Sequence, residues 1–285
     1  MKLYMGCGSS IRENQITEFE NTGLYIAEPK FDGIFGGCVS NGNQKYFSRN
    51  GKEKVLKLPE LPTGTIVVGE LGYGSQVALE RRAALGHDFM DVIDILQVDN
   101  LDVSQEDDNQ RRQILENAWH SWSDEVKSHF LLSKRVSKNF RSLFDSEDEG
   151  IVLKKIKCRP LSSYQISSYN PNWFKCKKEL TTDLVIMGYT VSKSDSFQGL
   201  AQAVKCGVFK SGQLIHVCSV GSLDTEMRSG LVNNWSEYDG KVIEVKGYKV
   251  FSSGHIRHPS IGAKKIRDDK DSQECTWESL MRCRR

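Results

Sequence analysis

The chain has 285 residues, 38% of them hydrophobic, and a formal net charge of only +2 at pH 7. This length and apolar content suit one large or two ordinary folded domains. No apolar stretch is long enough to cross a bilayer, and residues 1–14 lack the apolar run of a secretory signal. We therefore expect a cytoplasmic protein without a membrane partner.

Basic side chains are concentrated in two segments despite the balanced total. Residues 150–178 hold seven Lys or Arg and no Asp or Glu, and residues 241–285 hold eleven basic and six acidic residues. Aromatic residues are interleaved with the first segment, at Tyr164, Tyr169, Trp173 and Phe174. Such segments suit phosphates, either on a nucleotide or along a nucleic-acid backbone.

The N-terminal part of the chain predicts a mixture of strands and helices. Continuous apolar runs predict buried strands over residues 63–71, 88–96 and 149–155. A short helix is predicted over residues 77–85, between the first two strands.

A longer helix is predicted over residues 105–122. We expect Ser104 to cap its first turn, where acidic residues are concentrated. Apolar side chains recur on one face of this helix, at Ile114, Leu115, Ala118, Trp119 and Trp122. This face is predicted to pack against the core.

The pattern changes after "KKELTTD" (177–183) to short strands at regular spacing. Strands are predicted over 184–191, 201–210, 213–220 and 241–250, and a helix interrupts them over 223–235. About five short strands with one helix in about 100 residues are typical of a small barrel. We therefore predict a boundary near residues 179–182, giving domains 1–180 and 181–285.

The tetrapeptide Lys30-Phe31-Asp32-Gly33 follows an apolar run and predicts a turn that presents a lysine. Taken alone, this pattern fits an ordinary surface turn as well as a nucleophile. A lysine attacks a phosphate only when neutral, so neighbouring cations and burial should lower its pKa. Lys175 and Lys177 alternate on one face of a predicted strand and are candidates to meet the same phosphate.

Carboxylates and further cations complete the candidate chemistry. Glu149 heads the strand that includes 149–154 and is a candidate to hold Mg²⁺ against a phosphate. Glu70 ends a buried strand, where it could hold a ribose or a metal. Expelling pyrophosphate requires cations placed opposite the attacking nitrogen, and Arg257, Arg267 and Lys270 are candidates.

Taken in order, these segments resemble the covalent nucleotidyltransferase superfamily, and most closely the small ATP-dependent DNA ligases. The resemblance runs from Glu28 to Lys270. The matching segments are "KFDG" (30–33), "FSRNG" (47–51), "GEL" (69–71), "DIL" (94–96), "EGIVLK" (149–154), "WFKCK" (173–177) and "GHIRHPSIGAKKIRDDK" (254–270).

The resemblance implies an α+β fold: a nucleotidyltransferase (ATP-grasp-like adenylation) domain of antiparallel sheets and helices, followed by a C-terminal OB-fold β-barrel. It implies a DNA ligase that uses ATP and Mg²⁺, with Mn²⁺ as a substitute, to seal nicked double-stranded DNA through a lysyl-AMP intermediate. It also implies a monomer that clamps around DNA, in a bacterial, phage or viral context.

The resemblance assigns roles to particular residues. The catalytic set is Lys30 as the nucleophile that receives AMP, with Lys175, Lys177, Arg267 and Lys270. The nucleotide-binding set adds Glu28, Asp32, Gly33, Arg49, Glu70, Ile93 and Glu149. Glu149 and Glu70 would hold the metal, and Ser48, Arg49, Lys154 and Arg257 would contact DNA, with Arg49 on the 5′-phosphate.

The chain departs from the family pattern at three places, one of which is that Glu70 follows Gly69 where the family more often has Asp. Phe35 stands where ligases usually carry an arginine that holds the ribose, and Ile93 stands where an aromatic residue usually stacks on the adenine. Three alternative functions are an RNA or hybrid-nick ligase, an mRNA-capping guanylyltransferase that uses GTP, and a single-strand-binding module without catalysis.

Overall fold

The structure is a computed structural model that describes residues 7–156, 169–194 and 197–284. Lys157, Arg159 and Tyr164 of the basic segment lie outside the described residues. The chain divides into two compact units, Met1–Lys177 and Lys178–Arg285, which are described separately below.

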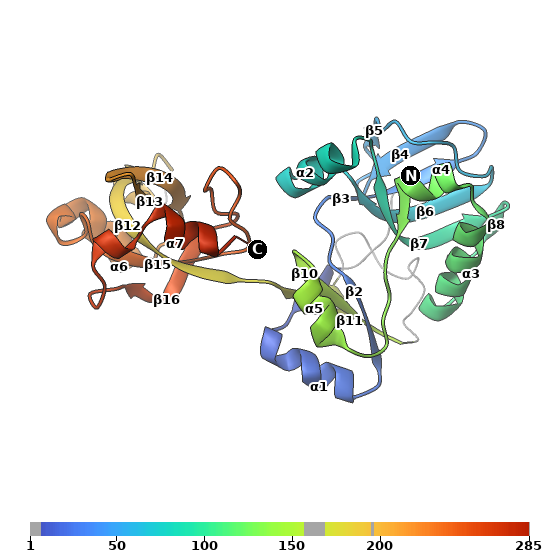
Figure 1. Cartoon of the computed structure of the whole chain (residues 1–285), viewed down its shortest axis with the longest axis horizontal. Coiled ribbons are helices and arrows are strands. Elements are labelled where there is room, and N and C mark those ends of the chain that lie inside the picture. Colours follow the sequence, from blue (N-terminus) through green and yellow to red (C-terminus); the bar gives the residue numbers. More distant parts are fainter. Residues whose placement is uncertain (1–6, 157–168, 195–196, 285) are drawn as a thin grey trace. The chain divides into compact units, whose positions relative to one another are not determined.

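The first unit contains two β-sheets (Figure 1). A four-stranded sheet has the order β1-β11-β10-β2, in which β1 and β11 run parallel and the other neighbours antiparallel. Its strands are β1 (Cys7–Ser10), β2 (Tyr25–Pro29), β10 (Gly150–Lys155) and β11 (Tyr169–Lys177). The sheet therefore brings together segments from the beginning and the end of the unit.

The second sheet has seven strands, which come from the middle of the unit's sequence, between Ile34 and Leu132. The strand order is β5-β4-β3-β6-β7-β8, and β9 pairs with β7. The sheets were predicted to be antiparallel, but the pairs β7–β9 and β1–β11 are parallel. The strands are β3 (Ile34–Ser40), β4 (Gln44–Ser48), β5 (Glu53–Lys54), β6 (Thr65–Leu71), β7 (Met90–Val98), β8 (Leu101–Asp102) and β9 (Phe130–Leu132). The predicted strands at 63–71 and 88–96 are confirmed as β6 and β7.

Helices cover one face of each sheet. Helices α1 (Ile16–Asn21) and α5 (Phe140–Ser146) pack on the four-stranded sheet (Figure 1). Helices α3 (Asp108–Ser121) and α4 (Asp124–His129) pack on the seven-stranded sheet. The opposite faces of the sheets are left to form the site described below. The predicted helix at 77–85 is confirmed as α2 (Gln76–Leu85).

The long helix α3 begins three residues later than predicted. Its N-cap is Asp107, whose side chain accepts a hydrogen bond from the backbone N–H of Gln110, while the Gln110 side chain accepts from Asp107. This reciprocal capping box satisfies two backbone N–H groups, those of Asp107 and Gln110. A capping box joins residues three positions apart, so Ser104 could not form one with Gln110. The backbone N–H of Ser104 instead donates to Asp102. The predicted apolar face does pack on the core.

The second unit contains a five-stranded antiparallel sheet of order β14-β13-β12-β15-β16. Its strands are β12 (Leu180–Val191), β13 (Ala201–Lys210), β14 (Gln213–Val220), β15 (Val242–Gly247) and β16 (Ser260–Ile266). Helix α6 (Thr225–Asn233) lies between β14 and β15 in the chain, and α7 (Trp277–Arg282) follows the last strand. Both helices contribute to the core of this unit.

Two further observations concern the part of the chain that the structure describes. It contains no helix long and apolar enough to cross a membrane. The six cysteines whose side chains are described are all free thiols.

Candidate functional site

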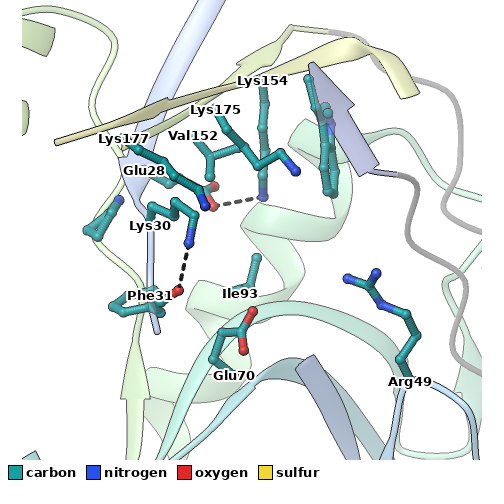
Figure 2. A pocket seen from close by; sticks show the side chains of 13 residues that line it. Glu28, Lys30, Phe31, Arg49, Glu70, Ile93, Val152, Lys154, Lys175 and Lys177 are labelled. Carbon is teal, nitrogen blue, oxygen red and sulfur yellow. Dashed lines mark hydrogen bonds and ion pairs between the residues drawn. The ribbon is translucent and has the colours of Figure 1, made fainter. Parts of the chain in front are cut away.

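A cavity of about 280 Å³ lies between the two sheets of the first unit. Both sheets contribute side chains to it, and Figure 2 shows them pointing into a common space. The lining residues are Gly8, Glu28, Pro29, Lys30, Phe31, Arg49, Glu70, Ile93, Val152, Lys154, Trp173, Lys175 and Lys177. The volume is close to the lower end of the range for small-molecule sites.

The four-stranded sheet supplies most of the charged side chains through simple strand alternation. Trp173, Lys175 and Lys177 of β11 line the cavity, whereas Phe174 and Cys176 pack in the core beneath α1 and α5. Successive side chains of a strand point to opposite faces, so every second residue reaches the cavity. The predicted placement of both lysines on one face is therefore correct.

Lys30 leaves the end of β2 and enters the cavity beside Glu149. Its Nζ lies 3.2 Å from Glu149 Oε1, and it also donates to the carbonyl oxygen of Phe31 at 3.4 Å (Figure 2 shows the second contact). The backbone N–H of Lys30 donates to the carbonyl of Gly150 at 2.9 Å. Gly150 has φ +116°, and a Cβ there would lie 2.0 Å from Cys176 O, so only glycine fits this junction.

Glu28 is buried at the back of the cavity and paired with two cations. Its Oε2 lies 2.7 Å from Lys154 Nζ, and its Oε1 accepts from Arg135 at 2.6–2.7 Å (Figure 2 shows the lysine contact). Burial alone would raise the pKa of Glu28, but the charges of Lys154 and Arg135 outweigh it and lower the pKa to about 2. Glu28 is therefore ionised at all physiological pH values.

Glu70 behaves in the opposite way at the other wall. Its Oε2 is buried and has no hydrogen-bond partner among the described residues, and burial raises the pKa of Glu70 to about 8, although Lys30 and Arg49 oppose the rise. A protonated carboxyl is a hydrogen-bond donor and a poor metal ligand. In the structure as it stands, Glu70 is better suited to a hydroxyl group than to a cation.

The turn after Lys30 packs directly against Glu70. A Cβ on Gly33 would lie 2.5 Å from Leu71 O and 3.5 Å from Glu70 Oε2, so a glycine is needed for this close approach. The carbonyl of Asp32, beside it, accepts from the Ser75 hydroxyl that caps α2. These contacts hold the lysine-bearing turn on the seven-stranded sheet.

Two aliphatic side chains line the cavity from different sheets. Ile93 comes from β7 and Val152 from β10, and Ile93 is 9% exposed. They provide apolar surface without an aromatic ring. Phe35, the other departure from the family pattern, is buried next to the cavity and does not line it.

Arg49 lines the cavity from the loop after β4, with its guanidinium pointing towards the same space as Glu70 (Figure 2). Ser48, which was also predicted to contact DNA, does not line the cavity, and its hydroxyl donates to the carbonyl of Lys52 at 3.2 Å. The structure therefore brings one of these two neighbours into the site.

Lys154 is buried in the wall of the cavity. The resemblance predicts a DNA contact, but the side chain is only 2% exposed, paired with Glu28 and 4.7 Å from the centre of the Trp173 ring. Its position on β10 has the same parity as Val152, so strand alternation turns it into the cavity. Lys154 therefore belongs to the buried wall of the site.

The predicted cations of the second unit lie among carboxylates of that unit. Arg267 is paired with Asp183 at 3.2 Å and with Asp269 at 2.8 Å, and Lys270 is paired with Asp183 at 3.5 Å. These carboxylates raise the pKa of Arg267 further above its usual range. Arg257 lies on the loop between β15 and β16, where its backbone N–H donates to the backbone carbonyl of Lys249.

Sequence reasoning missed Arg135. It binds Glu28, and its guanidinium also lies 2.8 Å from Asp108 of α3, so it connects the four-stranded sheet to a helix that packs on the seven-stranded sheet. The segment around it, "SKRVSK", carries no pattern that distinguishes a buried arginine from surface charge. Within the described residues no group of three His, Cys, Asp or Glu is arranged to hold a metal.

Comparisons with known proteins give a consistent assignment. A family model described as the ATP-dependent DNA ligase domain matches residues 76–177, a segment that includes Glu149, Lys175 and Lys177. The chain is 27% identical over 196 residues to the SPbeta prophage-derived DNA ligase-like protein LigB of Bacillus subtilis (strain 168), covering 62% of this chain and 70% of that protein.

Solved structures of ligases share the fold. A structure from the study "DNA binding with a minimal scaffold: Structure-function analysis of Lig E DNA ligases" has a TM-score of 0.65 at 16% identity, covering 94% of this chain and 99% of that chain. The ligase domain of M. tuberculosis LigD has a TM-score of 0.50 at 16% identity, covering 96% and 98%. At such identities the likeness establishes the mixed α/β fold.

The family match and the relative are both described as DNA ligases, so the RNA-ligase, capping-enzyme and non-enzymatic alternatives are not favoured. The predicted resemblance to ATP-dependent DNA ligases is confirmed, and the two matches support a DNA ligase enzyme.

Proposed function

We propose that this enzyme seals nicks with a 5′-phosphate and a 3′-hydroxyl in duplex DNA through a lysyl-AMP intermediate. The observation that carries the proposal is the placement of Lys30 beside Glu149, in a cavity that Lys175, Lys177 and Arg49 also line. An amine, a carboxylate and several cations around one cavity are the groups that phosphoryl transfer from a nucleotide requires.

The reaction has three steps. The neutral amine of Lys30 attacks the α-phosphorus of ATP, forming a P–N bond as the bond to pyrophosphate breaks, and the nitrogen loses a proton to solvent. An oxygen of the DNA 5′-phosphate then attacks the same phosphorus, the P–N bond breaks, and the lysine leaves as an amine after its nitrogen regains a proton. The 3′-hydroxyl attacks the 5′-phosphorus, loses its proton, and AMP leaves. Lys175 and Lys177 stabilise charge on the transferred phosphate.

The cavity suits the adenosine part of the nucleotide. The base is placed between Ile93 and Val152, which give apolar contact but no aromatic stacking. Glu28 accepts from the base, and the protonated Glu70 carboxyl, whose Oε2 has no partner in the described part of the chain, bonds a ribose hydroxyl. Asp32 and Gly33 hold the turn that allows the nucleotide to approach Lys30.

Mg²⁺, or Mn²⁺ in its place, would be held by Glu149, with Glu70 as a second ligand once it loses its proton. Mg²⁺ usually takes only one or two protein carboxylates and keeps waters and substrate phosphates as its other ligands, so a preformed cluster is not required. When bound, the ion would neutralise charge on the phosphates.

The second unit is proposed to be an OB-fold, with the domain boundary at residue 180. Three consecutive strands, a helix and two further strands, in the order β14-β13-β12-β15-β16, support this assignment. Its cations Arg267 and Lys270 would orient the departing pyrophosphate, and Arg257 would contact DNA. Arg49 would bind the 5′-phosphate of the nick.

The proposed partner is nicked double-stranded DNA, which the protein clamps as a monomer in the cytoplasm. Such an activity would serve DNA replication, repair or recombination. The two basic segments support binding to a polyanion.

Sealing is tested on a labelled nicked duplex with a 5′-phosphate or a 5′-hydroxyl, supplied with ATP, GTP or NAD⁺ and with Mg²⁺ or EDTA. We expect a full-length product only with the 5′-phosphate, ATP and metal. Sealing with GTP but not with ATP would contradict the proposed nucleotide. Sealing only of nicks whose strands are RNA would contradict the proposed DNA substrate.

A further inference from the structure

Phe35 occupies a buried position between the two sheets of the first unit. It is 6% exposed and packs with Val68, Trp173 and Leu96, which come from three other strands. This apolar cluster adjoins the cavity, because Trp173 belongs to both. A charged side chain at position 35 would be buried among these groups, which is costly without a partner.

Phe35 is also the neighbour of Arg49 across the β3–β4 hairpin. The pairing of the two strands ends at Gly36 and Ser48. The backbone N–H of Arg49 then donates to the backbone carbonyl of Phe35 at 2.9 Å. The guanidinium carbon of Arg49 lies 5.2 Å from the centre of the Phe35 ring. One face of the ring therefore supports the cation, within the distance at which the two attract each other.

An arginine on a loop loses considerable rotamer freedom when it is held in one direction. An aromatic ring beneath the guanidinium reduces the number of directions available before any ligand binds. Arg49 is thereby kept pointing into the cavity, towards the side that Glu70 lines (Figure 2). The charge of Arg49 also lowers the pKa of Glu70, against the larger effect of burial, so the two groups interact through the cavity.

We propose that Phe35 is a positioning residue for Arg49, and that its ring pre-orients the guanidinium for the terminal phosphate of the DNA strand. The inference rests on the proposed function, because it assigns Arg49 to the 5′-phosphate. The residue that departs from the family pattern thus has a role of its own. Phe35 touches neither the nucleotide nor the DNA and acts through Arg49.

Loss of the ring should remove orientation but leave the charge of Arg49 in place. General attraction between the protein and DNA should therefore persist, while the part of the affinity that depends on the 5′-phosphate should decrease. Cation–π contacts of this kind correspond to about a three- to thirtyfold change in affinity. A purely structural role would weaken folding without changing phosphate discrimination.

The experiment compares two nicked duplexes that differ only in a 5′-phosphate or a 5′-hydroxyl. Dissociation constants of the full chain are measured by fluorescence anisotropy in EDTA, where no sealing occurs, with and without prior adenylylation. The reading is the ratio of the two constants. We expect Phe35→Leu to reduce the preference for the phosphate by about three- to thirtyfold, and Phe35→Tyr to retain it.

The matched control is Val68→Ala, which removes apolar contacts from the same cluster without touching Arg49. It should lower the melting temperature and leave the ratio unchanged. Phe35→Met replaces Phe35→Leu if the latter does not fold. Arg49→Ala gives the full loss, and the double variant Phe35→Leu, Arg49→Ala should be no worse than Arg49→Ala alone.

The outcomes separate the inference from the proposed function. If Arg49→Ala leaves the ratio unchanged, Arg49 does not bind the phosphate, and both the assignment and the inference fail. If Arg49→Ala removes the preference while Phe35→Leu keeps it, only the inference is overturned. Failure of the proposed adenylylation would be seen separately, as the absence of covalent AMP on the wild-type chain.

Discussion

Lys30 Nζ lies 3.2 Å from Glu149 Oε1, although the two residues are 119 positions apart in the chain. The pair forms because β2 and β10 are neighbours, so the residue that follows one strand meets the residue that precedes the other. The attacking form of a lysine is the neutral amine, which makes no ion pair. The ion pair must therefore be lost before attack, and a metal ion on Glu149 would compete for the same carboxylate.

Glu149→Gln tests whether this carboxylate serves the reaction. We expect covalent AMP formation to slow by about two to three orders of magnitude, because a metal ion stabilises transferred charge by several kcal/mol. Single-turnover adenylylation with labelled ATP measures the rate, with Asp148→Asn as the adjacent control. A faster rate in Glu149→Gln would mean that the carboxylate only restrains the resting lysine.

Glu70→Gln tests the carboxyl whose Oε2 is buried without a partner among the described residues. The pKa of Glu70 is raised from 4.5 to about 8 in the folded protein. The contribution of protonated Glu70 to the free energy of unfolding is therefore fully present below pH 4.5 and is lost as the pH rises through 8. The variant has no proton to lose, and its stability relative to wild type should therefore increase from pH 5 to pH 9, by no more than about 5 kcal/mol.

Urea denaturation at several pH values measures this difference for Glu70→Gln. The exposed Glu60→Gln serves as the control and should show no such trend. A constant difference between Glu70→Gln and wild type across the pH range would show that Glu70 titrates normally.

Arg135→Gln tests the buried ion pairs behind the cavity. Removing this partner leaves Glu28 with Lys154 as its remaining close cation and takes the nearest cation from buried Asp108, which should lower the free energy of unfolding by up to about 3–5 kcal/mol. Glu28 has a pKa lowered to about 2, so its contribution is present above pH 4.5 and is lost as the pH falls through 2. Without Arg135 the pKa of Glu28 in the folded protein should lie closer to 4.5, so the contribution of Glu28 should be smaller and its loss should be complete at a higher pH than in the wild type.

The matched control for Arg135→Gln is Arg141→Gln, which removes an exposed pair with Glu13 and should change stability far less. Equal losses in the two variants, measured by urea denaturation at pH 7, would mean that burial of the network does not determine its contribution.

The double variant Arg267→Ala, Lys270→Ala tests the role of the second unit. If these cations orient pyrophosphate, attack on ATP should slow by about two to four orders of magnitude, while sealing of a nick that already carries AMP should change little. Lys241→Ala, Lys265→Ala removes the same charge from exposed ion pairs and is the control. Equal losses in both assays, or no loss in either, would count against the assignment.

The paired state of these cations adds a second variant. Asp183 holds both Arg267 and Lys270, so a pyrophosphate would have to replace it. Asp183→Asn weakens this competition, and we expect a lower Michaelis constant for ATP in adenylylation. A raised constant would indicate that Asp183 is needed to hold the two cations in place.

Local patterns predicted much of the fold because strand alternation and helix periodicity are properties of neighbouring residues. Strands β13 and β14 begin and end where predicted. The start of α3 was wrong because Ser104 and Asp107 are both good caps, and the choice depended on Gln110 three residues further along. Alternation also explains why Lys175 and Lys177 reach the cavity together.

Contacts between distant segments were outside the reach of such patterns. Nothing around Glu28 or Arg135 indicates that they meet, because the contact depends on a backbone pairing between Ala27 and Val136, which are far apart in the chain. Lys154 looked like one more exposed cation of a basic segment, and only its neighbours on the folded sheet show it to be buried. The contact between Phe35 and Arg49 likewise depends on the register of a hairpin.

The most direct test of the account is whether Lys30 carries AMP. The full chain is incubated with α-labelled ATP and Mg²⁺, denatured, and digested, and the labelled peptide is identified by mass spectrometry, with Lys30→Ala and Lys175→Ala measured in parallel. We expect acid-labile label on Lys30, none on Lys30→Ala, and slower labelling of the same lysine in Lys175→Ala. Wild-type labelling of folded Lys30→Ala, or label on another residue, would contradict the account.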